Sequence, residues 1–223
     1  FGKIFSNKNA DKTAIPASTT EHETIVFEVL SQYKSSSFPH GILAFSQQTN
    51  VSEVNNSLVV HLTLPFPCAG ELELVAQSLS ETLSVEVIFE INLAIESVRK
   101  HSIKNVGNII AVASGKGGVG KSTTSVNLAY ALIAEGAKVG ILDADIYGPS
   151  IPSMLGHKDT KPTSVDGKLM QPIEVHGLNA MSIGFLVPDE EATVWRGPMA
   201  SSAFSQLLNE TAWPKIDYLI IDM

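Results

Sequence analysis

Cysteine is nearly absent from this sequence, and long hydrophobic runs are missing altogether. The single cysteine among the 223 residues, Cys68, cannot form an internal disulfide and cannot by itself supply a four-ligand metal site. No apolar run approaches the ~18 residues that a membrane helix needs, and no basic-then-apolar leader opens the chain. These absences predict a soluble, cytoplasmic protein with no membrane partner.

Positive charge is also scarce. The 15 Lys and Arg residues stand against 23 Asp and Glu residues, and the resulting net charge of −8 argues against a protein that binds nucleic acid. One lysine in a loop barely changes that total, so a local phosphate-binding site is compatible with it. Hydrophobic residues make up 44% of the chain and charged residues 17%, a composition that allows a packed core and excludes wholesale disorder.

The first part of the chain has the elements of a small α+β domain. Residues 1–20 lack a sustained hydrophobic period and are expected to be a flexible leader. The Asn55-Asn56 pair is typical of a turn between two strands. For residues 21–92 the pattern predicts a helix over Glu21–Ser35, strands over Gly41–Ser46 (extending as far as Val54) and Ser57–Leu64, a helix over Ala69–Leu83, and a strand over Ser84–Ile91.

After a predicted linker at residues 93–107, the pattern changes to that of an α/β fold. Ile109–Ala113 is a continuous apolar run, which is typical of a strand buried on both faces of a parallel sheet. A helix over Ser122–Glu135 and a strand over Lys138–Asp145 follow, so that we expect a strand–helix–strand unit. Tyr218–Ile221 is the next predicted strand. Residues 108–223 are therefore predicted to form a second, α/β domain with a parallel sheet.

The glycine-rich loop between that first strand and helix fits G-x-x-x-x-G-K-[ST], the phosphate-binding P-loop. Glycines allow the positive φ angles with which successive backbone N–H groups can point inward at phosphate oxygens. The helix that follows adds its positive N-terminal dipole. Lys121 is expected to contact the β- and γ-phosphates and Ser122 to ligate Mg²⁺. The predicted nucleotide-binding residues are Gly115, Lys116, Gly117, Gly118, Val119, Gly120, Lys121, Ser122 and Thr123.

A dinucleotide-binding fingerprint is the alternative interpretation of the same loop. The three glycines Gly115, Gly117 and Gly120 also satisfy G-x-G-x-x-G, and Asp143 follows at about the distance of the acid that binds a ribose. Lys121 and Ser122 favour the triphosphate, because the P-loop requires that pair and the dinucleotide fingerprint does not.

Three carboxylates accompany the loop. Asp143 and Asp145 end the strand over Lys138–Asp145, and Asp222 follows four apolar residues in a Walker B pattern. Ligands of parallel α/β sheets lie beyond the carboxyl ends of the strands, where these acids are expected. One of Asp143 and Asp145 can instead cap a helix or form the turn before Gly148-Pro149.

The loop and later segments resemble a known family. The extra lysine Lys116 makes GKGGVGKST similar to the deviant Walker A motif of the MinD/ParA/Mrp class of dimeric ATPases. Within that class, LDADIYGPSIPSMLG (Leu142–Gly156), VWRGPMASSAF (Val194–Phe204) and DYLIIDM (Asp217–Met223) resemble the Mrp, or ApbC-type, iron–sulfur cluster carrier ATPases. The stretch LVVHLTLPFPCAGELELVAQSL also resembles the small iron–sulfur-assembly accessory domain that precedes the ATPase in bacterial members.

The resemblance implies roles for individual residues. Lys116 is expected to cross a homodimer interface and contact the partner's nucleotide. Asp145 is expected to position or activate the attacking water, which makes Lys116, Lys121 and Asp145 the expected catalytic residues. The expected Mg²⁺ set, direct or through water, is Ser122, Asp143, Asp145 and Asp222.

The resemblance also implies a function, that of an ATP-hydrolysing homodimer that carries iron–sulfur clusters from assembly proteins to apo-protein recipients. The family binds a bridging [4Fe–4S] cluster through a C-x-x-C pair far downstream of Walker B, and Cys68 cannot substitute for that pair. We therefore expect a C-terminally truncated chain with an incomplete sheet and no cluster ligands, the cluster being bound only by the full-length dimer. The alternatives are a MinD/ParA-like positioning ATPase, a dinucleotide-binding oxidoreductase, and a binding module without ATPase activity.

Overall fold

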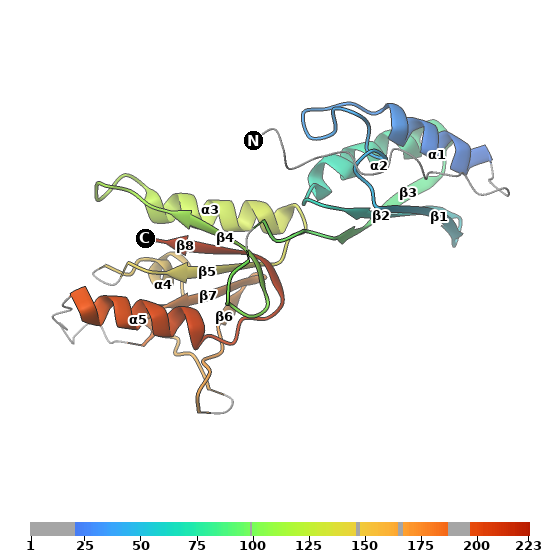
Figure 1. Ribbon diagram of the computed structural model, residues 1–223. Helices are drawn as coiled ribbons and strands as arrows, with labels where there is room; N and C mark the ends of the chain where they lie inside the picture. Colours follow the sequence, from blue (N-terminus) through green and yellow to red (C-terminus); the bar gives the residue numbers. More distant parts are fainter. Residues whose placement is uncertain (1–20, 99, 146–147, 165–166, 187–196) are drawn as a thin grey trace.

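The computed structural model describes residues 21–98, 100–145, 148–164, 167–186 and 197–223. The leader expected at residues 1–20 therefore lies outside the described residues, as do 146–147 and 194–196 of the segments that carry the family resemblance. The described residues form one three-stranded and one five-stranded sheet, each with its own helices (Figure 1). We call the part built on the first sheet the N-terminal unit and the part built on the second sheet the C-terminal unit.

The N-terminal unit has the order β1-β2-β3 in its sheet, with β1 and β2 antiparallel and β2 and β3 parallel. The helices α1 and α2 lie together on one face of this sheet (Figure 1). The elements are α1 (Glu21–Gln32), β1 (Gln48–Val54), β2 (Ser57–Leu64), α2 (Ala69–Leu83) and β3 (Glu86–Leu93).

Alternation of apolar residues explains how the strands face the helices. Along β2, Leu58, Val60, Leu62 and Leu64 are buried in the core that α1 and α2 cover, whereas His61 and Thr63 point to the other, open face. The predicted Asn55-Asn56 turn is confirmed, since both residues have positive φ angles (51° and 69°) and join β1 to β2. The predicted bounds of β2 and α2 are confirmed as well.

The strand predicted over Gly41–Ser46 is wrong. This segment forms turns and bends, and the first strand begins only at Gln48. Gly41 has φ of +91°, and a Cβ there would collide with the carbonyl oxygen of Ser31, so the chain packs back on the end of α1 at this point. The third strand also begins later than predicted, because Ser84 takes the left-handed conformation (φ 54°) that ends α2.

The C-terminal unit has the strand order β4-β8-β5-β7-β6, in which β6 alone is antiparallel to its neighbour. The α/β fold class with a mainly parallel sheet is thus confirmed. The predicted strand–helix–strand unit is present as β4, α3 and β5, with β8 inserted between the two strands. Its elements are β4 (Val106–Val112), α3 (Lys121–Ala134), β5 (Val139–Asp143), α4 (Ile151–Met154), β6 (Ile173–Val175), β7 (Leu178–Ser182), a 3₁₀ turn (Ile183–Phe185), α5 (Gly197–Asn209) and β8 (Ile216–Asp222).

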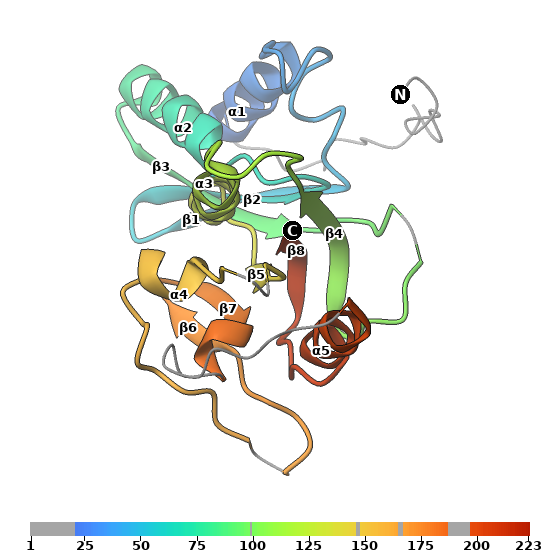
Figure 2. The same cartoon turned by 90° about the vertical axis from the view of Figure 1, so that its left-hand side faces the viewer.

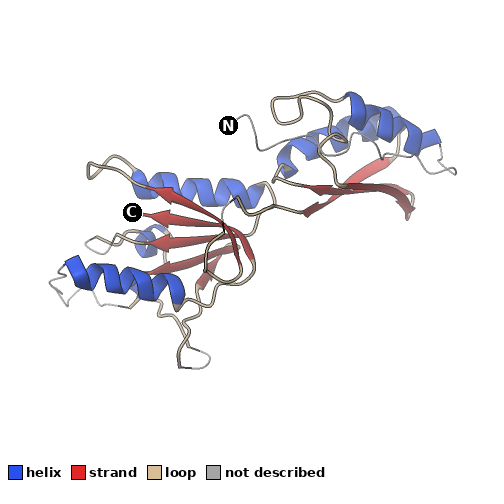
Figure 3. Cartoon of the chain, viewed as in Figure 1, coloured by secondary structure: helices blue, strands red, loops and turns tan. Residues whose placement is uncertain are grey.

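Helices cover both faces of this sheet. Helix α3 lies on one face and α5 on the other (Figures 2 and 3). Alternate residues of the central strands point to opposite faces of the sheet and contribute to two hydrophobic cores. Ile141 and Ile220 pack on the α3 side, and Leu142 and Leu219 pack on the α5 side. Every residue of β5 is buried, as expected of an inner strand of a parallel sheet.

Two sequence expectations for this sheet need correction. The apolar run Ile109–Ala113, which covers the second half of β4, is not buried on both faces, because β4 lies at the edge of the described sheet and most of its residues are only half-buried. The strands β6 and β7 were not predicted. At three and five residues they are short, and a tight turn with His176 and Gly177 at positive φ joins them.

The two units meet where α3 ends and α2 begins (Figure 1). The Glu135 carboxylate accepts a hydrogen bond from the Gly70 backbone N–H at 2.9 Å, and the Glu135 carbonyl accepts one from Ala69 N–H at 3.3 Å. The residue before α2, Cys68, gives no side-chain cap. Glu135 therefore caps α2 from the other unit.

Candidate functional site

The glycine-rich loop joins β4 to α3 at the carboxyl edge of the C-terminal sheet. Gly118 and Gly120 have φ angles of 74° and 89°, a conformation that L side chains rarely adopt. Gly120 is the last residue before α3, and residues 115–120 are all exposed. The loop thus presents backbone N–H groups and the N-terminus of a 14-residue helix to solvent.

Asp222 faces the start of α3 from the last position of β8. Its Oδ2 atom lies 2.6 Å from Lys121 Nζ and accepts a hydrogen bond from Ser122 Oγ at 2.6 Å. Asp222 is 0% exposed and the Lys121 side chain 12% exposed. The structure therefore brings Asp222 against two residues that precede it by 101 and 100 positions, in a region with little water to screen the ion pair.

Sequence reasoning missed one residue of this cluster. Ser125 is fully buried, and its hydroxyl donates to Asp222 Oδ1 at 2.6 Å. The signal was available in the spacing, since a residue three positions after Ser122 on a helix faces the same neighbouring strand. No motif used in the sequence interpretation extends that far.

Asp143 is turned away from the loop. Its Oδ1 accepts from the Asp145 backbone N–H at 3.1 Å, and its Oδ2 accepts from Ile151 N–H at 3.1 Å and from Ser182 Oγ at 3.2 Å. Burial raises the pKa of Asp143 to about 6, against the lowering effect of these hydrogen bonds. Of the two acids at this strand end, Asp143 is thus the one that forms the turn and holds the start of α4.

Asp145 and Lys116 lie at the open side of the cluster. Asp145 Oδ2 is 3.8 Å from Lys121 Nζ, and the Asp145 side chain is 37% exposed. Lys116 is exposed, and its backbone carbonyl accepts a hydrogen bond from Ser114 Oγ at 3.0 Å. Both residues are therefore accessible to a ligand that reaches the loop.

A hollow of about 550 Å³ opens beside the loop, within the size range of small-molecule sites. One wall is the glycine loop and the other is formed by the first turns of α5. The lining residues are Ser114, Gly115, Lys116, Gly117, Lys121, Ala144, Asp145, Ala200, Ser201, Phe204 and Met223. A cationic, N–H-rich wall of this kind suits an anionic ligand such as a phosphate chain.

The oxygen atoms of the cluster are of the kind that suits a divalent cation. Within the described ranges, no three His, Cys, Asp or Glu side chains converge on one point that could hold a metal ion. Both oxygens of Asp143 accept hydrogen bonds from the protein, namely from Asp145 N–H, Ile151 N–H and Ser182 Oγ. The adjacent pair Ser122 Oγ and Asp222 Oδ2 offers hydroxyl and carboxylate oxygens, the donor types that Mg²⁺ takes together with water and phosphate.

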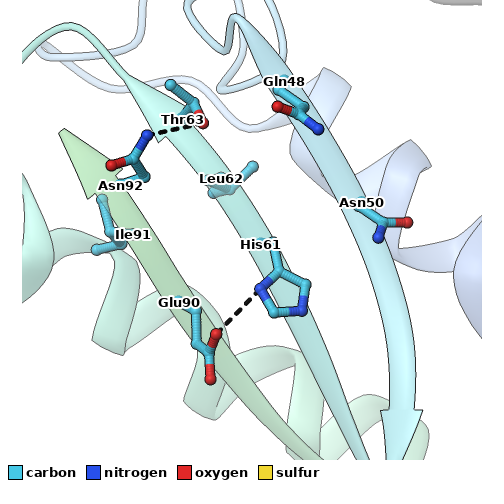
Figure 4. Close-up of a pocket in the computed structure, with 8 residues that line it drawn as sticks. All are labelled: Gln48, Asn50, His61, Leu62, Thr63, Glu90, Ile91 and Asn92. Atoms are coloured by element: carbon cyan, nitrogen blue, oxygen red, sulfur yellow. Dashed lines mark hydrogen bonds and ion pairs between the residues drawn. The ribbon is translucent and has the colours of Figure 1, made fainter. Parts of the chain in front are cut away.

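The N-terminal unit has a second hollow, of about 510 Å³, on the open face of its sheet (Figure 4). His61 Nδ1 lies 3.0 Å from Glu90 Oε2, and the other ring nitrogen lies 3.3 Å from Ser52 Oγ. The side chains of Gln48, Asn50 and Asn92 complete a polar rim.

Cys68 is buried beneath the capped end of α2. Burial, with the nearby Glu71 and Glu135 carboxylates, raises the pKa of the Cys68 thiol to about 12. The thiolate form of Cys68, which is the form that ligates metal, is therefore disfavoured. A separate finding concerns membranes: no helix in the described part of the chain is long and apolar enough to cross one.

Comparisons with known proteins bear on the same region. Residues 105–223 match the model of a family described as ParA: NUBPL iron-transfer P-loop NTPase. The chain is 46% identical over 214 residues to the iron-sulfur cluster carrier protein of Haemophilus influenzae, covering 92% of this chain and 58% of that protein. It is 47% identical over 208 residues to the iron-sulfur cluster carrier protein of Salmonella typhimurium, covering 89% of this chain and 56% of that protein.

Among solved structures, the nucleotide-binding protein in complex with ADP from Archaeoglobus fulgidus is 39% identical, with 54% of this chain and 46% of that chain covered at a TM-score of 0.47. This chain spans somewhat more than half of the length of the curated relatives. The family match covers more than half of the chain and contains the glycine loop, Lys121 and Asp222. The chain belongs to the ParA family, as a P-loop NTPase of the NUBPL iron-transfer type.

Proposed function

We propose that this protein binds and hydrolyses ATP and uses that cycle to carry iron–sulfur clusters to apo-protein recipients. The observation that supports this most directly is the cluster of Lys121, Ser122 and Asp222 at the mouth of the glycine loop. Lys121 supplies a positive charge for phosphate groups, and the Ser122 hydroxyl and Asp222 carboxylate supply oxygens for Mg²⁺. The chain also belongs to a family of iron-transfer P-loop NTPases.

In this proposal the loop residues 115–123 hold the triphosphate, and Lys121 leaves Asp222 to contact the β- and γ-phosphates. Ser122 and Asp222 hold Mg²⁺, Asp222 either directly or through a water molecule. When bound, Mg²⁺ neutralises charge on the phosphate oxygens. Asp145 is accessible in the hollow and positions the attacking water, whereas Asp143 acts through the turn that it holds.

Lys116 acts in a homodimer in this proposal. Its exposed side chain lines the hollow, and it reaches the nucleotide of a second subunit, where its charge stabilises the transition state. The same dimer binds a [4Fe–4S] cluster through ligands other than Cys68, which is the only cysteine in the sequence and is buried. The N-terminal unit, predicted as residues 21–92, serves as an accessory domain, and residues 94–105 between β3 and β4 join it to the C-terminal unit. We place the protein and its assembly partners in the cytoplasm.

The dinucleotide alternative is disfavoured by one observation. It requires Asp143 to bind a ribose hydroxyl, but Asp143 is 0% exposed and both of its oxygens accept hydrogen bonds from the protein.

The proposed function is tested by cluster transfer. The full-length protein is reconstituted anaerobically with iron and sulfide and mixed with an apo-protein acceptor, and transfer is followed by circular dichroism with and without ATP and Mg²⁺. We expect bound iron and sulfide, and transfer whose rate changes with ATP. Phosphate release without any iron binding would contradict the carrier role and leave only an ATPase.

A further inference from the structure

We infer that Ser125 is a positioning residue that keeps the Asp222 carboxylate aimed at the Mg²⁺ position once nucleotide has bound. This inference rests on the proposed function and adds to it a residue that the P-loop motif does not include. It starts from the three contacts that Asp222 makes. Oδ2 contacts Lys121 and Ser122, and Oδ1 accepts from Ser125 at 2.6 Å.

The two contacts at Oδ2 are temporary in the proposed cycle. Lys121 must turn to the phosphates and Ser122 to the metal, so both leave Asp222 when nucleotide binds. Ser125 has no such second task. It lies one turn further along α3, is 0% exposed, and does not line the hollow beside the loop. Of the three protein contacts of the Asp222 carboxylate, the one with the Ser125 hydroxyl is therefore the one that remains after nucleotide binds.

The hydroxyl has a single proton and two acceptors within reach. Asp222 Oδ1 is at 2.6 Å and the Lys121 carbonyl at 3.2 Å. The shorter bond, to a charged acceptor, takes the proton. The backbone of Asp222 is fixed by pairing with Val112 and Asp143 on either side, so rotation of its side chain is the freedom that remains. Ser125 removes that freedom and satisfies an oxygen that water does not reach.

Removal of the hydroxyl should therefore weaken the response to Mg²⁺ more than the binding of nucleotide. In the Ser125→Ala variant we expect the Mg²⁺ concentration for half-maximal ATP hydrolysis to rise roughly tenfold, with a similar fall in kcat. ATP affinity measured by calorimetry in EDTA should stay within about threefold of the wild type, because the loop and Lys121 are intact.

Thr124→Ala is the matched control. Thr124 is the neighbouring residue on α3, is exposed, and donates its hydroxyl to the Gly120 carbonyl four positions back, without any bond to Asp222. It loses a hydroxyl of the same kind from the same turn. Ser125→Thr keeps the hydroxyl and should restore the Mg²⁺ response. If Ser125→Ala does not fold, Ser125→Cys replaces it, because a thiol of similar shape is a weak donor.

The outcomes separate this inference from the proposed function. If wild-type protein shows no Mg²⁺-dependent binding of ATP, the proposed function is wrong and the inference falls with it. If the wild type binds normally and Ser125→Ala matches Thr124→Ala in its Mg²⁺ dependence, only the inference is overturned. An equal loss of ATP affinity with and without Mg²⁺ would also overturn it, because that result indicates a general disruption of the site.

Discussion

Lys121 Nζ lies 2.6 Å from Asp222 Oδ2, so the lysine of the glycine loop and the acid at the end of β8 form an ion pair. Asp222 is fully buried and Lys121 nearly so. A phosphate chain that enters the hollow must therefore compete with Asp222 for the same ammonium group. In the proposed cycle, nucleotide binding is therefore coupled to the separation of Lys121 from Asp222.

Replacement of Asp222 by asparagine separates these steps. Asp222→Asn keeps the size of the side chain but removes the charge that holds Lys121 and attracts Mg²⁺. We expect ATP to bind in EDTA at least as tightly as in the wild type, and Mg²⁺ to lose its effect on affinity, with hydrolysis reduced at least tenfold. Calorimetry in EDTA and in Mg²⁺ measures both affinities. The same Mg²⁺ enhancement in the variant as in the wild type would remove Asp222 from the metal site.

The exposed lysine of the loop should act on hydrolysis and not on binding. In Lys116→Ala we expect ATP affinity within about threefold of the wild type and a fall in turnover of more than tenfold, because its charge acts on the transition state of a second subunit. Lys138→Ala is the control, since Lys138 is also exposed but lies at the far end of α3. Turnover by Lys116→Ala equal to that of the control would exclude the role across the dimer.

The cap between the two units should contribute to stability. Glu135→Ala removes the acceptor of the Gly70 N–H and a negative charge at the start of α2, and we expect the free energy of unfolding to fall by about 0.5–2 kcal/mol. Glu135→Gln keeps an acceptor and should lose less. Urea unfolding followed by circular dichroism measures the change. The control is Glu81→Ala, because Glu81 is an exposed residue of α2. Equal stability of Glu135→Ala and the control would show that the cap contributes nothing.

Cys68 should be unreactive in the folded protein. Its pKa is raised from 9.0 to about 12 by burial and by the carboxylates of Glu71 and Glu135. Because the folded state favours the protonated thiol, its contribution to stability is present below pH 9 and is lost as the pH rises from 9 towards 12. Alkylation by iodoacetamide at pH 8 should be at least about a hundredfold slower in native buffer than in urea. Rapid labelling in native buffer would contradict the buried position.

The sequence was most informative where local chemistry determines structure. The glycine loop, the Asn55-Asn56 turn, β2, α2 and the family were all predicted from short patterns, and the structure and the family match confirm them. The failures depend on contacts that the hydrophobic pattern of one segment does not determine. Gly41 follows a path set by the end of α1, and β6 and β7 are short strands stabilised by pairing with their neighbours. The bond between Ser125 and Asp222 joins residues 97 positions apart, and the helical spacing of Ser125 from Ser122 was the one local signal for it.

The central claim is that the loop binds a nucleoside triphosphate through Lys121. Its most direct test is a fluorescence or calorimetric titration of wild-type protein and the Lys121→Ala variant with ATP and Mg²⁺ and, separately, with NADH, after thermal unfolding has shown both proteins to be folded. The account predicts saturable binding of ATP by the wild type, at least about a hundredfold weaker binding by the variant, and no binding of NADH. Unchanged ATP affinity in Lys121→Ala, or saturable binding of NADH in place of ATP, would contradict it.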